Sequence, residues 1–240
     1  MEKVIKLSLI ISIAINAVLI GLVSTQVEPR LTLFAGKNWT GLNLSLLSQD
    51  RSELEPEGFD NMAQSLCAVG TWLFYDLPYY NANETAYMNY LHAPNGTSIY
   101  CSNFDSVFSN KTSSIRFVGS PKSITAETLT LYAKTYFQGQ SEYFTGDYSS
   151  PSLSETVSSL IITGSSPWTV FDRKGYSGTS WCIVPSGSNE TTPAFVVDIR
   201  SQGIPHGTIR SFKKGCLNST AVEVNIQKIS PGLHRGGILY

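Results

Sequence analysis

Short hydrophobic runs recur along this chain and predict β-strands rather than helices. Four such runs occupy residues 31–34, 72–75, 129–132 and 168–171, and clusters of Gly, Ser, Asn and Pro separate them. Few stretches after residue 25 show helical periodicity of any length. Many short strands between turn residues are typical of a β-sandwich. The pattern therefore predicts an all-β fold.

Each of these strands opens a phrase that the chain uses four times: an aromatic residue, four residues, a second aromatic, one residue and usually glycine. Two aromatics five positions apart share one face only if the segment between them folds back, because strand side chains alternate. Glycine supplies the positive φ of such a tight return. Pro78 and Ala82 in the second copy predict a distorted hairpin. The aromatic pairs are Phe34 and Trp39, Tyr75 and Tyr80, Tyr132 and Phe137, and Phe171 and Tyr176.

A second phrase, beginning with serine, follows each aromatic phrase and predicts a closing strand. It covers residues 65–70, 114–119 and 159–164, and more loosely 208–212. The widest gap follows the second copy and contains the Pro-bearing linker 119–123, so the units group in pairs. We expect a domain over 31–119, a second over 129–216, and a tail, 217–240, that forms either an edge strand or a loose end.

These phrases resemble the Greek key unit of the βγ-crystallins, in which the folded aromatic hairpin precedes a Ser-Ile or Ser-Leu strand. A glycine and then a tryptophan open the next unit in that family, as at Gly70 and Trp72 and at Gly164 and Trp168. The resemblance covers roughly residues 31–216. It implies two Greek key sandwich domains, each made from two paired units.

The resemblance also implies Ca²⁺ as a candidate ligand, held by the pattern [Asn/Asp]-[Asn/Asp]-x-x-[Ser/Thr]-Ser in each unit. Calcium takes six to eight hard oxygen ligands, which Asn, Asp, Gln and Ser side chains supply. Residues 60–65 and 109–114 each depart from the pattern once, whereas 154–159 and 203–208 depart further. A low-affinity site is therefore expected in the first domain alone. Its candidate ligands are Asp60, Asn61, Gln64, Asn110 and Ser113. The alternative is that these side chains only stabilise turns.

The N-terminus indicates export. Residues 7–23 form an apolar run after two lysines, and small residues follow at 23–25, so residues 1–25 are expected to be a signal peptide. The run is slightly short for a membrane span of about 20 residues, and an uncleaved signal anchor stays open as the alternative. Either way, the rest of the chain is expected to face the outside or a lumen.

Cysteines and glycosylation sequons fit an exported chain. The even number of cysteines, Cys67, Cys101, Cys182 and Cys216, favours disulfides, with pairing inside each domain as the simplest of three open connectivities. Asn38 and Asn110 head sequons too, but they fall in a predicted hairpin and in a candidate metal loop. The expected glycosylation sites are Asn43, Asn83, Asn95, Asn189 and Asn218.

Charge and motif content give no indication of nucleic-acid binding or catalysis. The net charge is −1, so the chain has no basic footprint, and 42% hydrophobic residues suffice for a core in each domain. His92, His206 and His234 lack zinc-binding spacing, and no nucleophile elbow or phosphate loop occurs. We expect no enzyme and no small-molecule substrate.

Three functions follow from this combination. The first is a secreted, non-enzymatic structural protein that binds calcium weakly. The second is an extracellular recognition or effector module, such as a toxin-associated subunit or a protease inhibitor. The third is a membrane-anchored lumenal protein, which requires residues 7–23 to be retained. Self-association or an extracellular protein partner is compatible with all three.

Overall fold

Strand β3 joins the first two repeats and belongs to both sheets of one β-sandwich. The computed structural model describes residues 27–84, 86–93, 99–186, 192–216, 222–229 and 232–235. Gly70 bends β3 at φ 94°, and a Cβ there would lie 2.9 Å from the Phe117 ring. Before the bend β3 pairs with β1 and β5, and after it with β4 and β6. The strands are β1 (Arg30–Phe34), β2 (Asn43–Leu47), β3 (Ser65–Tyr75), β4 (Met88–Ala93), β5 (Tyr100–Asn103) and β6 (Ser114–Phe117).

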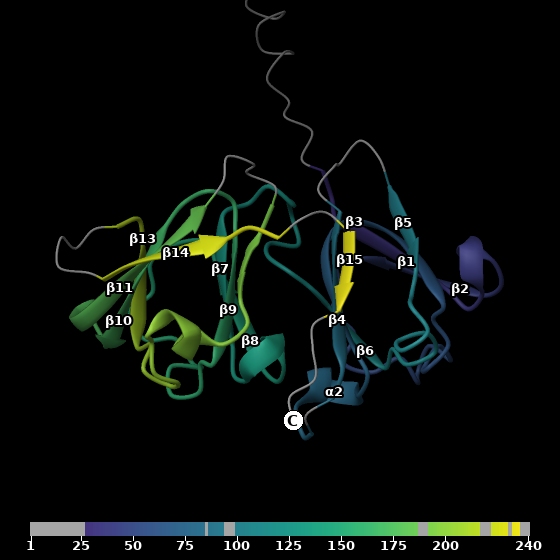
Figure 1. Ribbon diagram of the computed structural model, residues 1–240, viewed down its shortest axis with the longest axis horizontal. Coiled ribbons are helices and arrows are strands. Elements are labelled where there is room, and N and C mark those ends of the chain that lie inside the picture. Colours follow the sequence, from purple (N-terminus) through teal and green to yellow (C-terminus); the bar gives the residue numbers. More distant parts are fainter. Residues whose placement is uncertain are drawn as a thin grey trace, which may run out of the picture.

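The third and fourth repeats build a second sandwich beside the first (Figure 1). Its sheets have the strand orders β12-β9-β7-β8 and β13-β10-β11-β14. The strands are β7 (Thr128–Tyr132), β8 (Ser141–Phe144), β9 (Ser159–Thr163), β10 (Trp168–Arg173), β11 (Ser177–Ser186), β12 (Ala194–Val196), β13 (Ser211–Lys214) and β14 (Val222–Gln227). We call the sandwich that contains β3 sandwich 1 and the sandwich that contains β7 to β14 sandwich 2.

Within each sandwich the two repeats exchange chain segments, which is the Greek key arrangement that the sequence predicts. Strand β5 of the second repeat pairs with β3 in the first repeat's sheet, while Arg51 of the first repeat bridges to Ile115. Sandwich 2 repeats the exchange, because β12 pairs with β9 and Tyr148 bridges to Phe212. The all-β prediction is confirmed.

A serine fastens every folded hairpin in the same way. Its hydroxyl accepts a hydrogen bond from the backbone N–H of the second aromatic residue. The same hydroxyl donates to the backbone carbonyl of the residue three positions before that aromatic. Ser159, for example, accepts from Phe137 at 3.0 Å and donates to Lys134 at 2.6 Å. The other three serines are Ser65 with Trp39 and Gly36, Ser114 with Tyr80 and Leu77, and Ser211 with Tyr176 and Arg173.

The fourth serine corrects one sequence prediction. The loose match at 208–212 places the fourth closing strand at Thr208, whereas β13 begins at Ser211. The hydroxyl of Thr208 donates to Pro205 and takes no part in the hairpin. The match failed because another small hydroxyl residue precedes the true serine by three positions, so a strand-like Thr-Ile pair resembled the phrase.

The hairpins themselves carry residues with left-handed backbone. They contain the short 3-10 turns η1 (Lys37–Trp39) and η2 (Thr135–Phe137) and the single turn α2 (Pro78–Asn81). In α2 three successive non-glycine residues have positive φ, ending at Asn81 with φ 56°. Asn81 thus takes the left-handed conformation, to which an alanine is poorly suited, one residue before Ala82. This is the distortion that Pro78 and Ala82 predict. A further 3-10 turn, η3 (Ile199–Gln202), lies in the fourth repeat.

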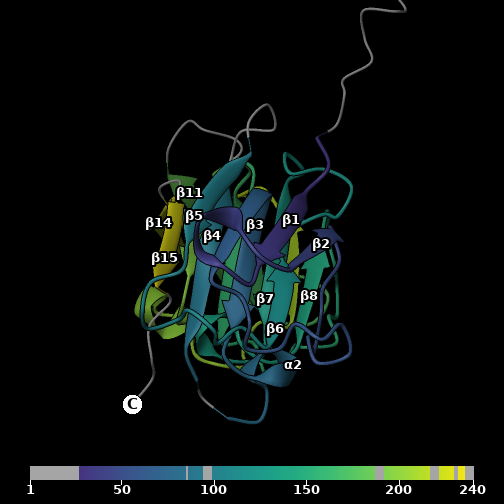
Figure 2. The same cartoon turned by 90° about the vertical axis from the view of Figure 1, so that its right-hand side faces the viewer.

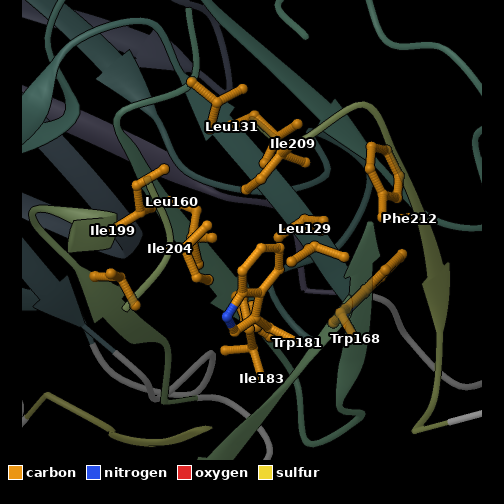
Figure 3. Close-up of a cluster of buried hydrophobic side chains, with 14 of the residues drawn as sticks. Leu129, Leu131, Leu160, Trp168, Trp181, Ile183, Ile199, Ile204, Ile209 and Phe212 are labelled. Atoms are coloured by element: carbon orange, nitrogen blue, oxygen red, sulfur yellow. The ribbon is translucent and has the colours of Figure 1, made fainter. Parts of the chain in front are cut away.

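Each sandwich has its own apolar core, and a third cluster joins them. The core of sandwich 2 packs Trp168 and Phe212 with aliphatic side chains of both sheets (Figure 3). Trp72, Phe74 and Leu33 lie in the corresponding core of sandwich 1. The third cluster takes residues from both sandwiches: Leu73, Tyr75, Met88, Val118, Tyr132, Phe137 and Ile161.

Hydrogen bonds between the hairpins of the second and third repeats reinforce this junction. Tyr75 donates its hydroxyl to the carbonyl of Phe137 at 2.7 Å, and Gly139 donates its N–H to the carbonyl of Tyr80 at 2.9 Å. Arg116, only 4% exposed, donates to the carbonyl of Gly139 at 3.0 Å. Its guanidinium also lies 3.6 Å from the centre of the Tyr80 ring. A buried cation stacked on an aromatic ring therefore lies between the sandwiches.

The tail contributes an edge strand to each sandwich. β14 runs parallel to β11 in sandwich 2, and β15 (Gly232–Arg235) runs antiparallel to β4 in sandwich 1. The two yellow strands in Figure 1 lie on different sandwiches, and Figure 2 places both on the same side of the molecule. The described parts of the tail are thus strands, which is the first of the two expectations.

Candidate metal site

Each candidate loop ends at the serine that begins the closing strand, so the four loops are aligned on these serines. The two loops of sandwich 1 meet through reciprocal backbone bonds, from Asn61 N–H to the carbonyl of Thr112 (3.0 Å) and from Asn110 N–H to that of Ala63 (2.9 Å). Both asparagines have positive φ, 54° and 60°. Backbone hydrogen bonds therefore hold the two loops against each other.

Three of the five predicted ligands form one connected group. Asn61 donates its side-chain N–H to Asp60 Oδ2 at 2.8 Å, and its carbonyl oxygen accepts from the hydroxyl of Ser113 at 3.5 Å. Asp60 and Asn61 come from the first repeat and Ser113 from the second. The loop of the second repeat thus contributes a side chain to the group of the first, as the resemblance implies.

The remaining two predicted ligands belong to a different group. Asn110 bonds through its backbone to Ala63, the neighbour of Gln64, so this pair repeats Asn61 and Ser113 with the two loops exchanged. No carboxylate lies in the motif positions of that group, because Ser109 stands where Asp60 stands in the other. Asp60, Asn61 and Ser113 thus lie in one group, whereas Gln64 and Asn110 take the pseudo-symmetric positions of the two loops.

Two buried side-chain oxygens of these two loops lack a protein partner. They are Asp60 Oδ1 and the hydroxyl of Thr112, whose backbone carbonyl holds Asn61. Buried polar atoms are almost always hydrogen-bonded, and an orphan oxygen indicates room for water or an ion. The donors of this group are all hard oxygens and include one carboxylate, a set that fits Ca²⁺. Thr112 was absent from the predicted ligands because its position in the motif carries no residue preference.

In sandwich 2 an ion pair replaces the corresponding oxygen pair. With Ser211 as the closing serine, the fourth loop is 206–211, so Gly207 and Arg210 take the places of Asn110 and Ser113. Gly207 N–H bonds the carbonyl of Val157 at 2.8 Å, as its counterparts do, which supports this register. The guanidinium of Arg210 lies 3.1 Å from Glu155, the counterpart of Asn61. The positive charge of Arg210 therefore lies where sandwich 1 has the hydroxyl of Ser113.

Within the described ranges, no three His, Cys, Asp or Glu residues gather closely enough to hold a metal ion. The group around Asp60 is of a different kind, because it has one carboxylate and otherwise amide and hydroxyl oxygens. It would bind through neutral oxygens, which predicts low affinity.

The histidines serve structural contacts. His206 lies 2.9 Å from Asp198, and hydrogen bonding from Arg200 holds the pKa of that carboxyl well below its usual range. Asp198 also accepts the backbone N–H of Arg200 at the start of η3, so the group caps this turn. His92 is buried on β4 and its Nδ1 bonds the hydroxyl of Thr71 at 3.0 Å.

Comparison with solved structures supports the fold. No family model and no curated protein matches the chain. Among solved structures, geodin, a βγ-crystallin from Geodia cydonium, is 19% identical, covers 78% of this chain and 98% of its own, and superposes with a TM-score of 0.58. The chain has the βγ-crystallin fold.

Two further matches superpose with lower TM-scores. A βγ-crystallin from an archaeon is 24% identical over 37% of this chain and 98% of its own, with a TM-score of 0.32. Protein S, solved in complex with calcium, is 15% identical over 78% of this chain and 99% of its own, with a TM-score of 0.28. TM-scores this low add nothing to the assignment of the fold.

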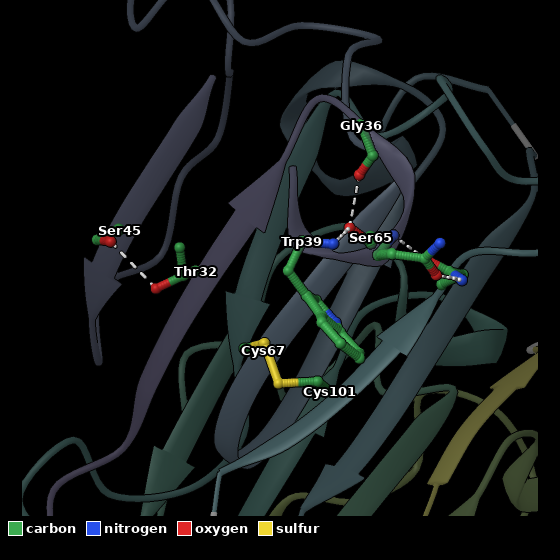
Figure 4. The surroundings of a disulfide bond; sticks show 9 residues. Thr32, Gly36, Trp39, Ser45, Ser65, Cys67 and Cys101 are labelled. Carbon is green, nitrogen blue, oxygen red and sulfur yellow. Dashed lines mark hydrogen bonds between the residues drawn. A yellow bond between two sulfur atoms is a disulfide. The ribbon is translucent and has the colours of Figure 1, made fainter. Parts of the chain in front are cut away.

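One disulfide lies within each sandwich of this βγ-crystallin fold. Cys67 on β3 lies opposite Cys101 on β5, beside the half-exposed Trp39 (Figure 4), and Cys182 on β11 pairs with Cys216. The intradomain pairing is confirmed. The two bridges join different positions of the repeat, as their placement in the sequence indicates.

The sequons and the N-terminal segment are only partly described. Asn43 and Asn83 are exposed, whereas Asn95, Asn189 and Asn218 lie outside the described residues, as does the predicted signal peptide, 1–25. The backbone N–H of Asn38 donates to Asn103 Oδ1, and its side-chain Oδ1 accepts a hydrogen bond from Asn103 Nδ2. In the part of the chain that the structure describes, no helix is both long and apolar enough to cross a membrane.

Proposed function

We propose that this protein is a non-enzymatic structural protein of the extracellular space that binds one Ca²⁺ weakly in sandwich 1. Asp60, Asn61 and Ser113 are the proposed side-chain ligands, with Thr112 beside them. The observation that carries the proposal is the orphaned carboxylate oxygen of Asp60 next to the bonded Asn61 and Ser113. A buried carboxylate oxygen without a partner is costly, and a bound cation would compensate it.

The contrast between the sandwiches supports a single site. Arg210 lies 3.1 Å from Glu155 in sandwich 2, so its positive charge would oppose the binding of a divalent ion there. The extracellular setting is supported by a disulfide in each sandwich, since such bonds persist in oxidising compartments. It is also supported by the exposed sequon at Asn43 and by the apolar segment predicted at 7–23.

Thermal unfolding with and without calcium tests the proposal. Weak extracellular sites have dissociation constants of about 10⁻⁴ to 10⁻³ M. At 10 mM Ca²⁺ and a Kd of about 1 mM, binding to the native state adds roughly 1.4 kcal/mol, which raises Tm by about 3–6 °C.

Two variants make this test specific. Asp60→Asn keeps the shape of the side chain but removes its charge, so the calcium-dependent rise in Tm should be lost. Glu155→Gln in sandwich 2 is the matched control and should keep the full rise. An absent rise in the unmodified chain, or an equal rise in Asp60→Asn, would reject the site.

A further inference from the structure

The C-terminal segment binds sandwich 1 although it is anchored on sandwich 2. β14 pairs with β11 over six register positions, from Val222 to Gln227. Val224 and Ile226 enter the core of sandwich 2, and the hydroxyl of Ser186 bonds the carbonyl of Ile226 at 2.8 Å. Beyond β14, Ile229 N–H bonds the carbonyl of Pro193 at 3.0 Å. Three positions later the chain already belongs to the other sandwich.

β15 meets sandwich 1 through three different kinds of contact. Its backbone adds a strand to β4, with Gly232 opposite His92 and Arg235 opposite Asn89. Leu233 packs against the core of sandwich 1. At the end of the strand, Arg235 forms an ion pair with Asp105.

A fourth contact, made by His234, places β15 at the junction between the sandwiches. The ring of His234 stacks on Tyr90, with centroids 5.0 Å apart and planes 21° apart. Tyr90 in turn packs edge-on against Phe195 of sandwich 2 at 4.8 Å, and Phe195 packs against Phe137 at 4.8 Å. A continuous series of rings thus leads from β15 into the third apolar cluster.

We propose that β15 is a clasp that fastens sandwich 1 to sandwich 2, and that the β4 edge is a strand-binding surface whose occupant is the chain's own segment 232–235. The surface takes an extended peptide that offers an apolar side chain, an aromatic ring and a cation in succession. Main-chain pairing supplies affinity in such strand addition, and the alternate side chains supply specificity. When the clasp is displaced, the same edge is free for an extended peptide of another chain.

The full-length chain allows a direct test by hydrogen exchange. Leu233→Asp places a charge against the core of sandwich 1 and should detach β15. We expect ~10-fold faster exchange of the β4 amides, the factor that a few cross-strand pairs supply together. Val222→Asp is the matched control, because Val222 lies in the same tail and is 55% exposed. It should leave β4 unchanged, and both variants should retain protection in β10.

A peptide of sequence 228–240 then probes the surface itself. Labelled with a fluorophore, it should bind Leu233→Asp at a concentration where it does not bind the unmodified chain or Val222→Asp. Unchanged β4 exchange in Leu233→Asp, or equal peptide binding by the unmodified chain, would overturn the clasp.

The ion pair provides a second route if Leu233→Asp loses protection throughout the molecule. Arg235→Glu should speed β4 exchange by opposing Asp105, and the exchanged pair Arg235→Glu with Asp105→Arg should restore it. A failure of the exchanged pair to restore protection would also overturn the proposal.

Discussion

The serine at the start of each closing strand can be tested one repeat at a time, and Ser159 offers the largest expected effect. Its hydroxyl holds the N–H of Phe137 and the carbonyl of Lys134. Ser159→Ala removes both hydrogen bonds without adding bulk. Phe137 is fully buried, so water cannot replace the lost acceptor. Ser65→Ala removes the equivalent bonds to the N–H of Trp39 and the carbonyl of Gly36, and Trp39 is 49% exposed.

The difference in burial sets the difference in cost. A buried N–H left without a partner costs about 1–3 kcal/mol, whereas a bond that water can replace contributes about 0.5–1.5 kcal/mol. Ser159→Ala should therefore lower the free energy of unfolding by roughly 2–3 kcal/mol, since the half-buried Lys134 carbonyl adds a smaller loss. Ser65→Ala should lower it by about 1 kcal/mol.

Urea unfolding followed by tryptophan fluorescence measures both losses. Ser158→Ala is the matched control, because its neighbouring hydroxyl bonds the carbonyl of Thr156, two residues away, and lies outside the hairpin. The urea dependence of the unfolding free energy should stay constant in all three variants if only stability changes. Equal losses in Ser159→Ala and Ser65→Ala, or no loss in either, would refute the reasoning from burial.

Two further predictions concern buried ionisable groups in sandwich 1. Arg116→Met should lower the unfolding free energy by about 2–3 kcal/mol, because the buried carbonyl of Gly139 loses its donor and Tyr80 loses its stacked cation; unchanged calorimetric unfolding would contradict this. Burial, with a smaller effect of His234, lowers the pKa of His92 to about 4. Below about pH 6.5 His92 binds a proton in the unfolded chain, whereas in the folded chain it stays neutral down to about pH 4. The free energy of unfolding should therefore fall by about 3 kcal/mol between pH 6.5 and 4. His92→Gln should remove this slope, and an equally steep slope in the variant would show that other groups cause it.

The fold follows from the sequence because its local signals agree with one another. The aromatic phrase, the glycine after it and the serine strand each act within about forty residues, and one unit is repeated four times. Turn chemistry and strand alternation therefore point to the same structure at every copy. The fourth serine phrase was misplaced because Thr208 and Ile209 imitate it, and only the hydrogen bonds to Tyr176 and Arg173 identify Ser211.

The candidate site was only partly predictable because it depends on contacts between loops. The motif names Asp60, Asn61 and Ser113 but does not reveal that Gln64 and Asn110 belong to another group. Thr112 and Arg210 carry no signal in the sequence, since their importance arises from an orphan oxygen and from an ion pair with Glu155. Such facts depend on packing between distant segments.

The tail shows the same limit. The alternation of residues 222–226 predicts a strand, but nothing local indicates that it pairs in parallel with β11 or that 232–235 crosses to β4. Sequence patterns identify edge strands more readily than their partners.

Backbone amide chemical shifts recorded during a calcium titration test the central claim most directly. The account predicts that the amides of 60–61 and 112–113 shift first and saturate together at millimolar Ca²⁺, while those of 155–158 and 206–210 do not move. Shifts of equal size in both sandwiches, or none in either at 10 mM Ca²⁺, would contradict a single calcium site at Asp60.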